Sequence, residues 1–111
     1  MAQDMRPWVK VHEAITATAV SGVIDCRGYN ALAVYASFSA AKNWTLSVMG
    51  APAPVGFNFV QCYDNAGTAM SKQTSAALFW IFHNVPDYVQ LKATEDVDGA
   101  EVTVYVAPCT V

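Results

Sequence analysis

The clearest strand pattern in the chain runs from Gly28 to Gly50 and reads GYNALAVYASFSAAKNWTLSVMG. It contains two runs of alternating residues, separated by a short break at Ala40–Asn43. One face of each run carries the large apolar side chains, namely Leu32, Val34, Ala36 and Phe38, then Trp44, Leu46 and Val48. This alternation predicts an antiparallel β-hairpin. A slip of one residue would turn the apolar face outward, so the register is well specified.

Short strands broken by turn residues continue on both sides of this stretch. We expect them at Ile15–Val20, Val23–Cys26, Phe57–Tyr63, Ala77–His83, Tyr88–Ala93 and Val102–Val106. Pro52 and Pro54 lack backbone donors and exclude Ala51–Gly56 from a central strand. The polar residues Thr68–Ser75 fit either a loop or a short strand. The pattern predicts an all-β antiparallel sandwich of about eight strands, with a jelly roll among the topologies that fit.

The predicted domain organisation is an N-terminal arm over residues 1–13 and one β-sandwich domain over residues 14–111. The arm includes a short edge strand at Val9–Val11, and it packs on its own domain or reaches a neighbour. Trp8 anchors it, because a tryptophan outside a strand needs a pocket for its large apolar surface. The predicted core includes Val34, Phe38, Leu46, Val48, Trp80, Leu91, Val102 and Val104. We expect the strand at Ala77–His83 to be covered on both faces.

The chain has few charges for a soluble domain. Hydrophobic residues make up 54% of it and charged residues 14%, where about 25% charge is usual. No Asp, Glu, Lys or Arg lies between Arg27 and Lys42, between Lys42 and Asp64, or between Lys72 and Asp87. Strands uncharged on both faces favour a surface covered by another copy of the chain. The alternative is a stable monomer with a neutral surface.

The distribution of charge and apolar residues bears on partners. The net charge is −3 and the six basic residues are scattered, so the chain lacks the basic patch of a nucleic-acid partner or an anionic membrane surface. The N-terminus has no apolar stretch of the kind found in secretory signals. No apolar run reaches the eighteen or so residues of a membrane span. We therefore expect neither nucleic acid nor a membrane among the partners.

No pattern of catalytic or metal-ligating residues stands out, and we expect neither an enzyme nor a bound cofactor. Cys26, Cys62 and Cys109 lack metal-site spacing and read as buried or half-buried thiols, with a disulfide between two of them left open. His12 lies in the arm, and His83 follows the apolar run and reads as a strand-end residue. The acidic stretch Glu95–Glu101 reads as a solvated hairpin tip rather than a calcium site.

A ligand-binding module is the alternative from another functional class. A small lectin-like sandwich would use a groove of aromatic side chains together with the acidic tip and Ca²⁺. The aromatic candidates for such a groove are Tyr35, Phe57, Phe59, Trp80 and Tyr88. Aromatic residues at strand period are more often core residues than binding residues.

The residues around the predicted hairpin resemble a known group of proteins. Val23–Val34 (VIDCRGYNALAV) with Trp44–Val48 (WTLSV) resembles a strand entry in small β-sandwich proteins of tailed-bacteriophage virions. The closing Val102–Val106 (VTVYV) is similar to their final strand. Such proteins serve as capsid decoration (cement) proteins, head fibres or tail components, and the resemblance carries no catalytic residues over.

The resemblance implies a role in the virion, at the capsid surface, after assembly in the host cytoplasm. The leading hypothesis for this role is a decoration protein that binds the coat lattice as an oligomer and stabilises the head. A tail or head-completion component is the nearest variant. The implied partners are further copies of the chain, with a trimer favoured by the threefold positions of a capsid, and the major capsid protein. The candidate interface residues are Pro7, Trp8, Val9, Tyr35 and Tyr105.

Overall fold

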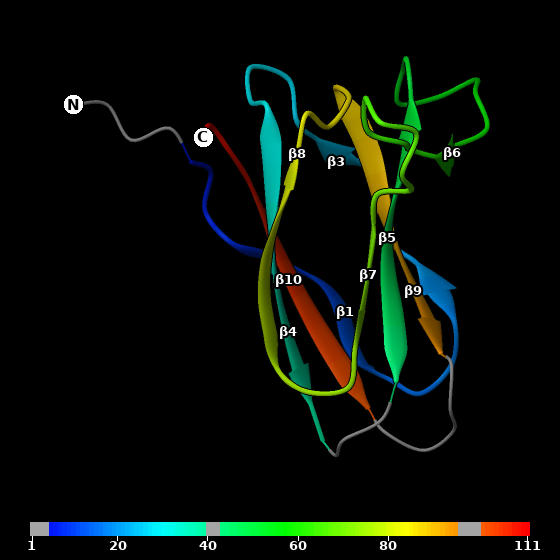
Figure 1. Ribbon diagram of the computed structural model, residues 1–111, viewed down its shortest axis with the longest axis vertical. Coiled ribbons are helices and arrows are strands. Elements are labelled where there is room, and N and C mark those ends of the chain that lie inside the picture. Colours follow the sequence, from blue (N-terminus) through cyan, green and yellow to red (C-terminus); the bar gives the residue numbers. More distant parts are fainter. Residues whose placement is uncertain (1–4, 40–42, 96–100) are drawn as a thin grey trace.

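The computed structural model describes residues 5–39, 43–95 and 101–111, which form two antiparallel sheets packed face to face (Figure 1). Sheet A has four strands in the order β1 (Val9–Ile15), β10 (Val102–Cys109), β4 (Ala31–Phe38) and β8 (Leu78–His83). At the centre of sheet B lie β9 (Tyr88–Glu95) and β5 (Trp44–Ala51). The short β2 (Ala19–Val20) and β3 (Ile24–Asp25) pair with β9, and β6 (Val60–Gln61) and β7 (Ser71–Thr74) pair with β5.

The strand order makes the sandwich a jelly roll. β2 and β3 lie one after the other along β9, and β6 and β7 do the same along β5. Each pair fills one strand position, so each sheet has four positions. The chain passes from one sheet to the other at nearly every connection, which is the winding of a jelly roll. The predicted all-β antiparallel sandwich is confirmed.

The predicted hairpin at the centre of the sequence is wrong in its pairing. Both of its strands exist as β4 and β5, but β4 lies in sheet A between β10 and β8, and β5 lies in sheet B beside β9. The two strands therefore face each other across the core instead of sharing a hydrogen-bonded ladder. Alternation identifies which face of a strand is buried, but it does not identify the neighbouring strand.

The apolar faces of the two sheets meet in one core. Six of the predicted core residues are fully buried, namely Val34, Leu46, Val48, Leu91, Val102 and Val104. Phe38 is partly buried and packs against them. Trp44 is the largest fully buried side chain. Its indole Nε1 has no hydrogen-bond partner in the described part of the chain.

The prediction that β8 is covered on both faces is wrong, and so is the assignment of Trp80 to the core. β8 is the last strand of sheet A, and Phe79 and Trp80 are 60% and 39% exposed. Trp80 pairs with the fully buried Val34 and so lies on the inner face, but at the open side of the sandwich. An unbroken apolar run does not reveal that its strand lies at an edge.

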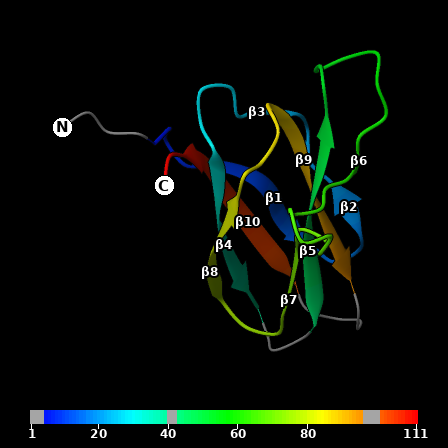
Figure 2. The same ribbon diagram turned by 45° about the horizontal axis from the view of Figure 1, so that its top comes forward.

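The region between β5 and β7 differs from the predicted strand at Phe57–Tyr63. Only β6 and an isolated bridge between Tyr63 and Ala69 are formed there, and the preceding loop projects from the sandwich (Figure 2). Val55 and Phe57 are exposed in this loop, so they have no core contacts to hold a strand in place. The stretch Thr68–Ser75, for which the sequence fitted either a loop or a short strand, contains the strand β7. This strand pairs with β5 beyond β6 in sheet B.

The N-terminal residues pack against their own domain. The edge strand extends beyond the predicted Val9–Val11 and runs over Val9–Ile15 along β10, so residues 9–13 lie in sheet A. The Arg6 backbone N–H donates to the Pro108 carbonyl at 2.9 Å, and the Arg6 guanidinium donates to the Asp25 carbonyl at 2.8 Å. Residues 5–13 of the predicted arm therefore contact their own domain.

Gly50 in β5 offers a test of the packing between sheet B and its loops. A Cβ at this position would lie 2.6 Å from both Cys62 Sγ and the Pro86 ring. We expect Gly50→Ala to lower the free energy of unfolding by about 1–3 kcal/mol, because a proline ring cannot turn aside. Urea denaturation measures this change. Gly22→Ala is the matched control, since nothing lies within 4 Å of its Cβ, and equal stability of the two variants would contradict the close packing.

Candidate interaction surface

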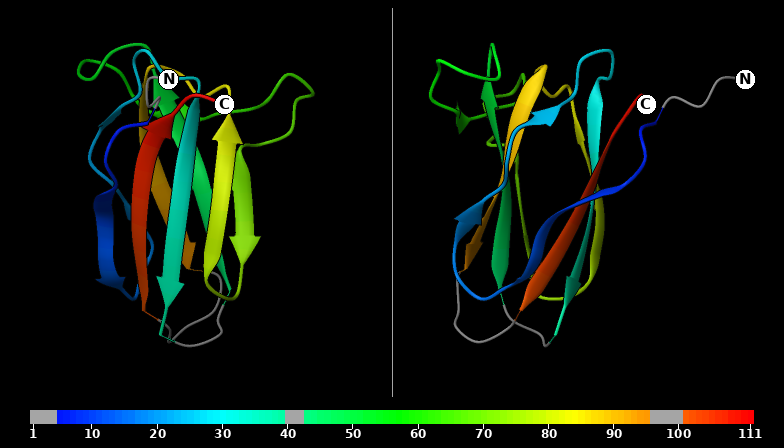
Figure 3. Two further views of the ribbon diagram at one scale, coloured as in Figure 1. Left: turned by 90° about the vertical axis from the view of Figure 1, so that its left-hand side faces the viewer. Right: turned by 180° about the vertical axis from the view of Figure 1, so that it is seen from behind.

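A row of aromatic side chains crosses the outer face of sheet A, which Figure 3 (left) shows face-on with β1, β10, β4 and β8 in order. Lys10 of β1 lies beside Tyr105 of β10. Tyr105 lies beside Tyr35, and Tyr35 lies beside Phe79 of β8. The Tyr35 and Tyr105 ring centroids are 6.3 Å apart. Strand register therefore brings three aromatic residues from distant parts of the sequence into one line.

Trp8 completes this surface from the opposite edge of the sheet. Its ring packs edge-on against Phe79, with centroids 5.7 Å apart and an interplanar angle of 69°. Trp8 precedes β1 and Phe79 lies on β8, so this contact spans β10 and β4. Ala33 and Ala107 are paired on those strands, and their short side chains leave room for the indole. We call Trp8, Tyr35, Phe79 and Tyr105 the aromatic face; they line a shallow depression of about 480 Å³.

The aromatic face is almost free of charge. Strands β4, β8 and β10 contain no Asp, Glu, Lys or Arg. Lys10 lies at the edge of the face, with its Nζ 5.8 Å from the centre of the Tyr105 ring. The Lys10 ammonium donates to Glu13 at 3.1 Å, and this hydrogen bond raises the pKa of Lys10. The surface is therefore suited to an uncharged partner surface rather than to an ionic one.

Three of the candidate interface residues, Trp8, Tyr35 and Tyr105, come together in the aromatic face. Pro7 and Val9 lie apart from it and line a groove of about 490 Å³ between β1 and β3. Phe79 is a member of the face that sequence reasoning missed, because β8 was expected to be covered on both sides. Its position opposite Tyr35 becomes apparent only when β4 and β8 are paired.

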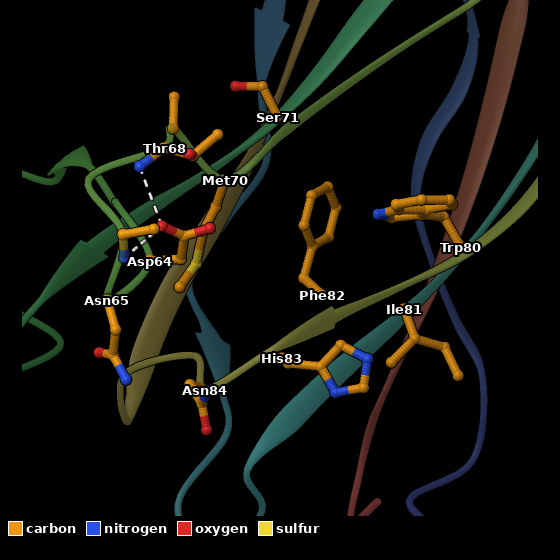
Figure 4. A pocket seen from close by; sticks show the side chains of 12 residues that line it. Asp64, Asn65, Thr68, Met70, Ser71, Trp80, Ile81, Phe82, His83 and Asn84 are labelled. Atoms are coloured by element: carbon orange, nitrogen blue, oxygen red, sulfur yellow. Dashed lines mark hydrogen bonds between the residues drawn. The ribbon is translucent and has the colours of Figure 1, made fainter.

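A third hollow, of about 510 Å³, lies at the open side of the sandwich. Consecutive β8 residues from Trp80 onward line one wall, and residues 64–66 and 68–71 line the other. Trp80 and Phe82 lie on one side of the β8 ribbon, and Ile81 and His83 lie on the other (Figure 4). The Asp64 carboxylate accepts hydrogen bonds from the backbone N–H groups of Ala66 and Thr68, both at 2.9 Å. We call this hollow the edge cleft.

The two histidines have different surroundings. His12 is buried, and its Nε2 lies 3.0 Å from the Leu91 carbonyl oxygen. A carbonyl only accepts hydrogen bonds, so Nε2 carries the proton and the bond joins β1 of sheet A to β9 of sheet B. The same carbonyl accepts a hydrogen bond from the Ser21 backbone N–H at 3.0 Å. His83 is exposed as the last residue of β8, as predicted.

The cysteines are free thiols, and their burial agrees with the prediction. Cys26 and Cys109 are buried and Cys62 is half-buried. Burial raises the pKa of the Cys26 thiol to about 12, and it also raises the pKa values of Cys62 and Cys109. Thiols held in this protonated form are poor nucleophiles and poor metal ligands. Within the described residues, no three His, Cys, Asp or Glu side chains gather in a group able to hold a metal ion.

The residues proposed for a lectin-like groove are dispersed. Tyr35 belongs to the aromatic face, Trp80 lines the edge cleft, and Phe57 lies in the projecting loop. Tyr88 stacks with Arg27, whose guanidinium carbon is 5.3 Å from the ring centre. The acidic tip lies largely outside the described residues, with only Glu95 and Glu101 inside them.

Among the residues that the structure describes, no helix is long and apolar enough to cross a membrane.

Comparison with solved structures supports the fold assignment. The crystal structure of the SPBc2 prophage-derived protein YomS is similar at a TM-score of 0.63 and 14% sequence identity, covering 99% of this chain and 96% of that chain. The Tobacco streak virus coat protein matches at a TM-score of 0.36 and 8% identity, over 100% of this chain and 89% of that chain, and this TM-score is too low to indicate a shared fold. No protein-family model and no curated protein matches the chain. The chain therefore shares its fold with a prophage-derived protein over nearly the full length of both.

Proposed function

We propose that this protein is a non-enzymatic structural protein of a phage virion and, most specifically, a capsid decoration protein. In this role it binds the coat lattice as a homo-oligomer at the capsid surface and stabilises the head. The observation that carries the proposal is the aromatic face, an uncharged surface of four large side chains. Trp8, Tyr35 and Phe79 remain 39%, 42% and 60% exposed. Large exposed aromatic residues grouped on a neutral sheet mark a surface that is covered in an assembly.

Two further observations support this role. The chain shares its fold with a prophage-derived protein, and its sequence resembles small virion β-sandwiches at the strands that became β4, β5 and β10. Jelly rolls are common in viral capsid domains, although they also occur in lectins. Since fold does not determine function, the proposal depends on the aromatic face.

The oligomer we propose is a trimer, which matches the local threefold positions of a capsid. Light scattering on the purified protein tests this state. A monomer at micromolar concentration would contradict stable self-association in solution, while leaving attachment to the coat to be tested separately.

Binding to coat shells that lack this protein tests the role of the aromatic face. We expect the wild-type protein to cosediment with the shells and Trp8→Ala to bind more weakly by more than about 1 kcal/mol, because Trp8 gives the face a large rigid contact. Tyr63→Ala is the matched control, since Tyr63 is 60% exposed and lies outside the face. Equal loss of binding in both variants would contradict an interface at the aromatic face.

Binding to other partners distinguishes this role from the two alternative functions, a tail or head-completion component and a lectin-like module. Absence of wild-type protein from the sedimented shells, with binding to tails or to heads awaiting completion, would assign the protein to the tail or connector instead. Calcium-dependent binding on a glycan array would favour the lectin-like module.

A further inference from the structure

Three edges of the sandwich are protected against pairing with another strand, and one is not. β1 has two register shifts and carries Lys10 and Glu13. β2, β3 and β6 are two residues long, and the four-residue β7 carries Lys72. Short strands, bulges and lysines are the devices by which proteins prevent edge pairing. β8 (LFWIFH) has six residues and contains no Asp, Glu, Lys, Arg or Pro.

The hydrogen-bond register shows which backbone groups of β8 are available. Asn84 N–H donates to the Asn30 carbonyl at 2.6 Å, just beyond the β4–β8 ladder. Bonded and non-bonded pairs alternate in an antiparallel ladder, so Phe82 and Trp80 bond to β4. The N–H and C=O groups of Phe79, Ile81 and His83 therefore point away from β4. No backbone hydrogen bond beyond the β4 ladder engages these three residues within the described chain.

The edge cleft lies along the free edge of β8 and limits what can bind there. Residues Trp80 to Asn84 line it consecutively, so it runs along the strand, and residues 64–71 bound its far side. An occupant has to fit between these walls, which suits a single extended segment better than the broad edge of a second sandwich. Trp80 lies on the inner face yet remains 39% exposed, so the core is incompletely covered at this point.

The charges near the cleft are already engaged. Lys72 Nζ lies 4.3 Å from the centre of the Trp80 ring. The Asp64 carboxylate is held by the backbone N–H groups of its own turn. The buried Met70 and Phe82 give the cleft an apolar lining, which the uncharged Asn65, Thr68, Ser71 and Asn84 border. An uncharged segment with apolar side chains at alternate positions matches this lining.

We propose that the free edge of β8 binds an extended, uncharged segment of a partner protein as an added antiparallel or parallel strand of sheet A. The backbone of the segment pairs with Phe79, Ile81 and His83. Alternate apolar side chains enter the edge cleft against Trp80 and Phe82. This is recognition by strand addition, in which backbone hydrogen bonds provide affinity and side-chain pockets provide specificity. The inference goes beyond the proposed function, because it concerns the backbone edge of β8 and the edge cleft rather than the outer face of sheet A, and it requires no virion.

A binding assay with purified protein tests the proposal. The probe is a fluorescein-labelled peptide of residues 31–38 (ALAVYASF) with two uncharged serines added at each end, since this strand already pairs with β8 within the fold. Its binding is measured by fluorescence anisotropy. We expect saturable binding, which Ile81→Pro weakens at least about tenfold, because proline removes the free N–H but leaves the β4 ladder intact. Ile81→Ala is the matched control and should bind within about threefold of wild type, because it keeps the backbone donor.

Amide hydrogen exchange provides a second readout that does not depend on the proline variant folding. In the wild-type protein, the peptide should slow exchange at Phe79 and Ile81, and leave the already bonded Trp80 and Phe82 amides unchanged. Absence of saturable binding up to millimolar peptide, or unchanged exchange at Phe79 and Ile81, would overturn the proposal. A wild-type dimer that Ile81→Pro converts to a monomer would also overturn it, by assigning the edge to a second copy of the chain.

Discussion

Replacement of Trp44 by alanine is expected to lower the free energy of unfolding by about 3–5 kcal/mol, the range for loss of a large buried aromatic side chain. Trp44 is the largest fully buried side chain and belongs to the core cluster between the two sheets. Its removal loses apolar burial and leaves a cavity that the surrounding strands fill only in part. Urea denaturation followed by circular dichroism measures the change, because the signal of the strands does not depend on the lost indole.

Two comparison variants show whether this loss comes from burial. Trp44→Phe should lose less than half as much stability as Trp44→Ala, because phenylalanine keeps much of the volume and removes an N–H that has no partner. Trp80→Ala removes the same side chain from a site that is 39% exposed, so it should also cost less than Trp44→Ala. Equal losses at positions 44 and 80 would contradict the open edge that the structure assigns to β8.

Cys26 is expected to resist alkylation far more strongly than Cys62 in the folded protein. Burial raises the pKa of Cys26 from 9.0 to about 12, which lowers its thiolate fraction at pH 8 by about a thousandfold. Full burial also prevents the reagent from reaching the sulfur. Iodoacetamide labelling at pH 8, followed by mass spectrometry of the peptides, should give a rate for Cys26 at least about a hundredfold below that of the half-buried Cys62.

Labelling in urea is the control for this comparison. Unfolding exposes both thiols and should bring their rates within a few-fold of each other, since their ordinary pKa values are the same. A Cys26 that reacts as fast as Cys62 in the native protein would show that the inner face of sheet B is open to solvent near this residue.

Three of the four residues of the aromatic face could be predicted from the sequence as candidate interface residues. Tyr35 and Tyr105 were identifiable as candidates because each lies outside the apolar row of its strand, and Trp8 because it is a tryptophan outside any predicted strand. Phe79 was not, because every residue around it in β8 is also apolar. Only the pairing of β8 with β4 places Phe79 beside Tyr35, and only the path of the chain before β1 brings Trp8 against it.

The amino-acid sequence was enough to predict the all-β class, most of the core and the lack of charge on the strands that became β4, β5, β8 and β10. These properties follow from alternation, turn residues and composition. Such patterns are local in the chain, and they directly reflect which side chains are buried. Three features became visible only in the folded chain: β4 and β5 lie in opposite sheets, β8 is an edge strand, and Trp80 is 39% exposed. The reason is that strand pairing joins residues far apart in the chain, and an apolar face fits equally well on a neighbouring strand or on the facing sheet.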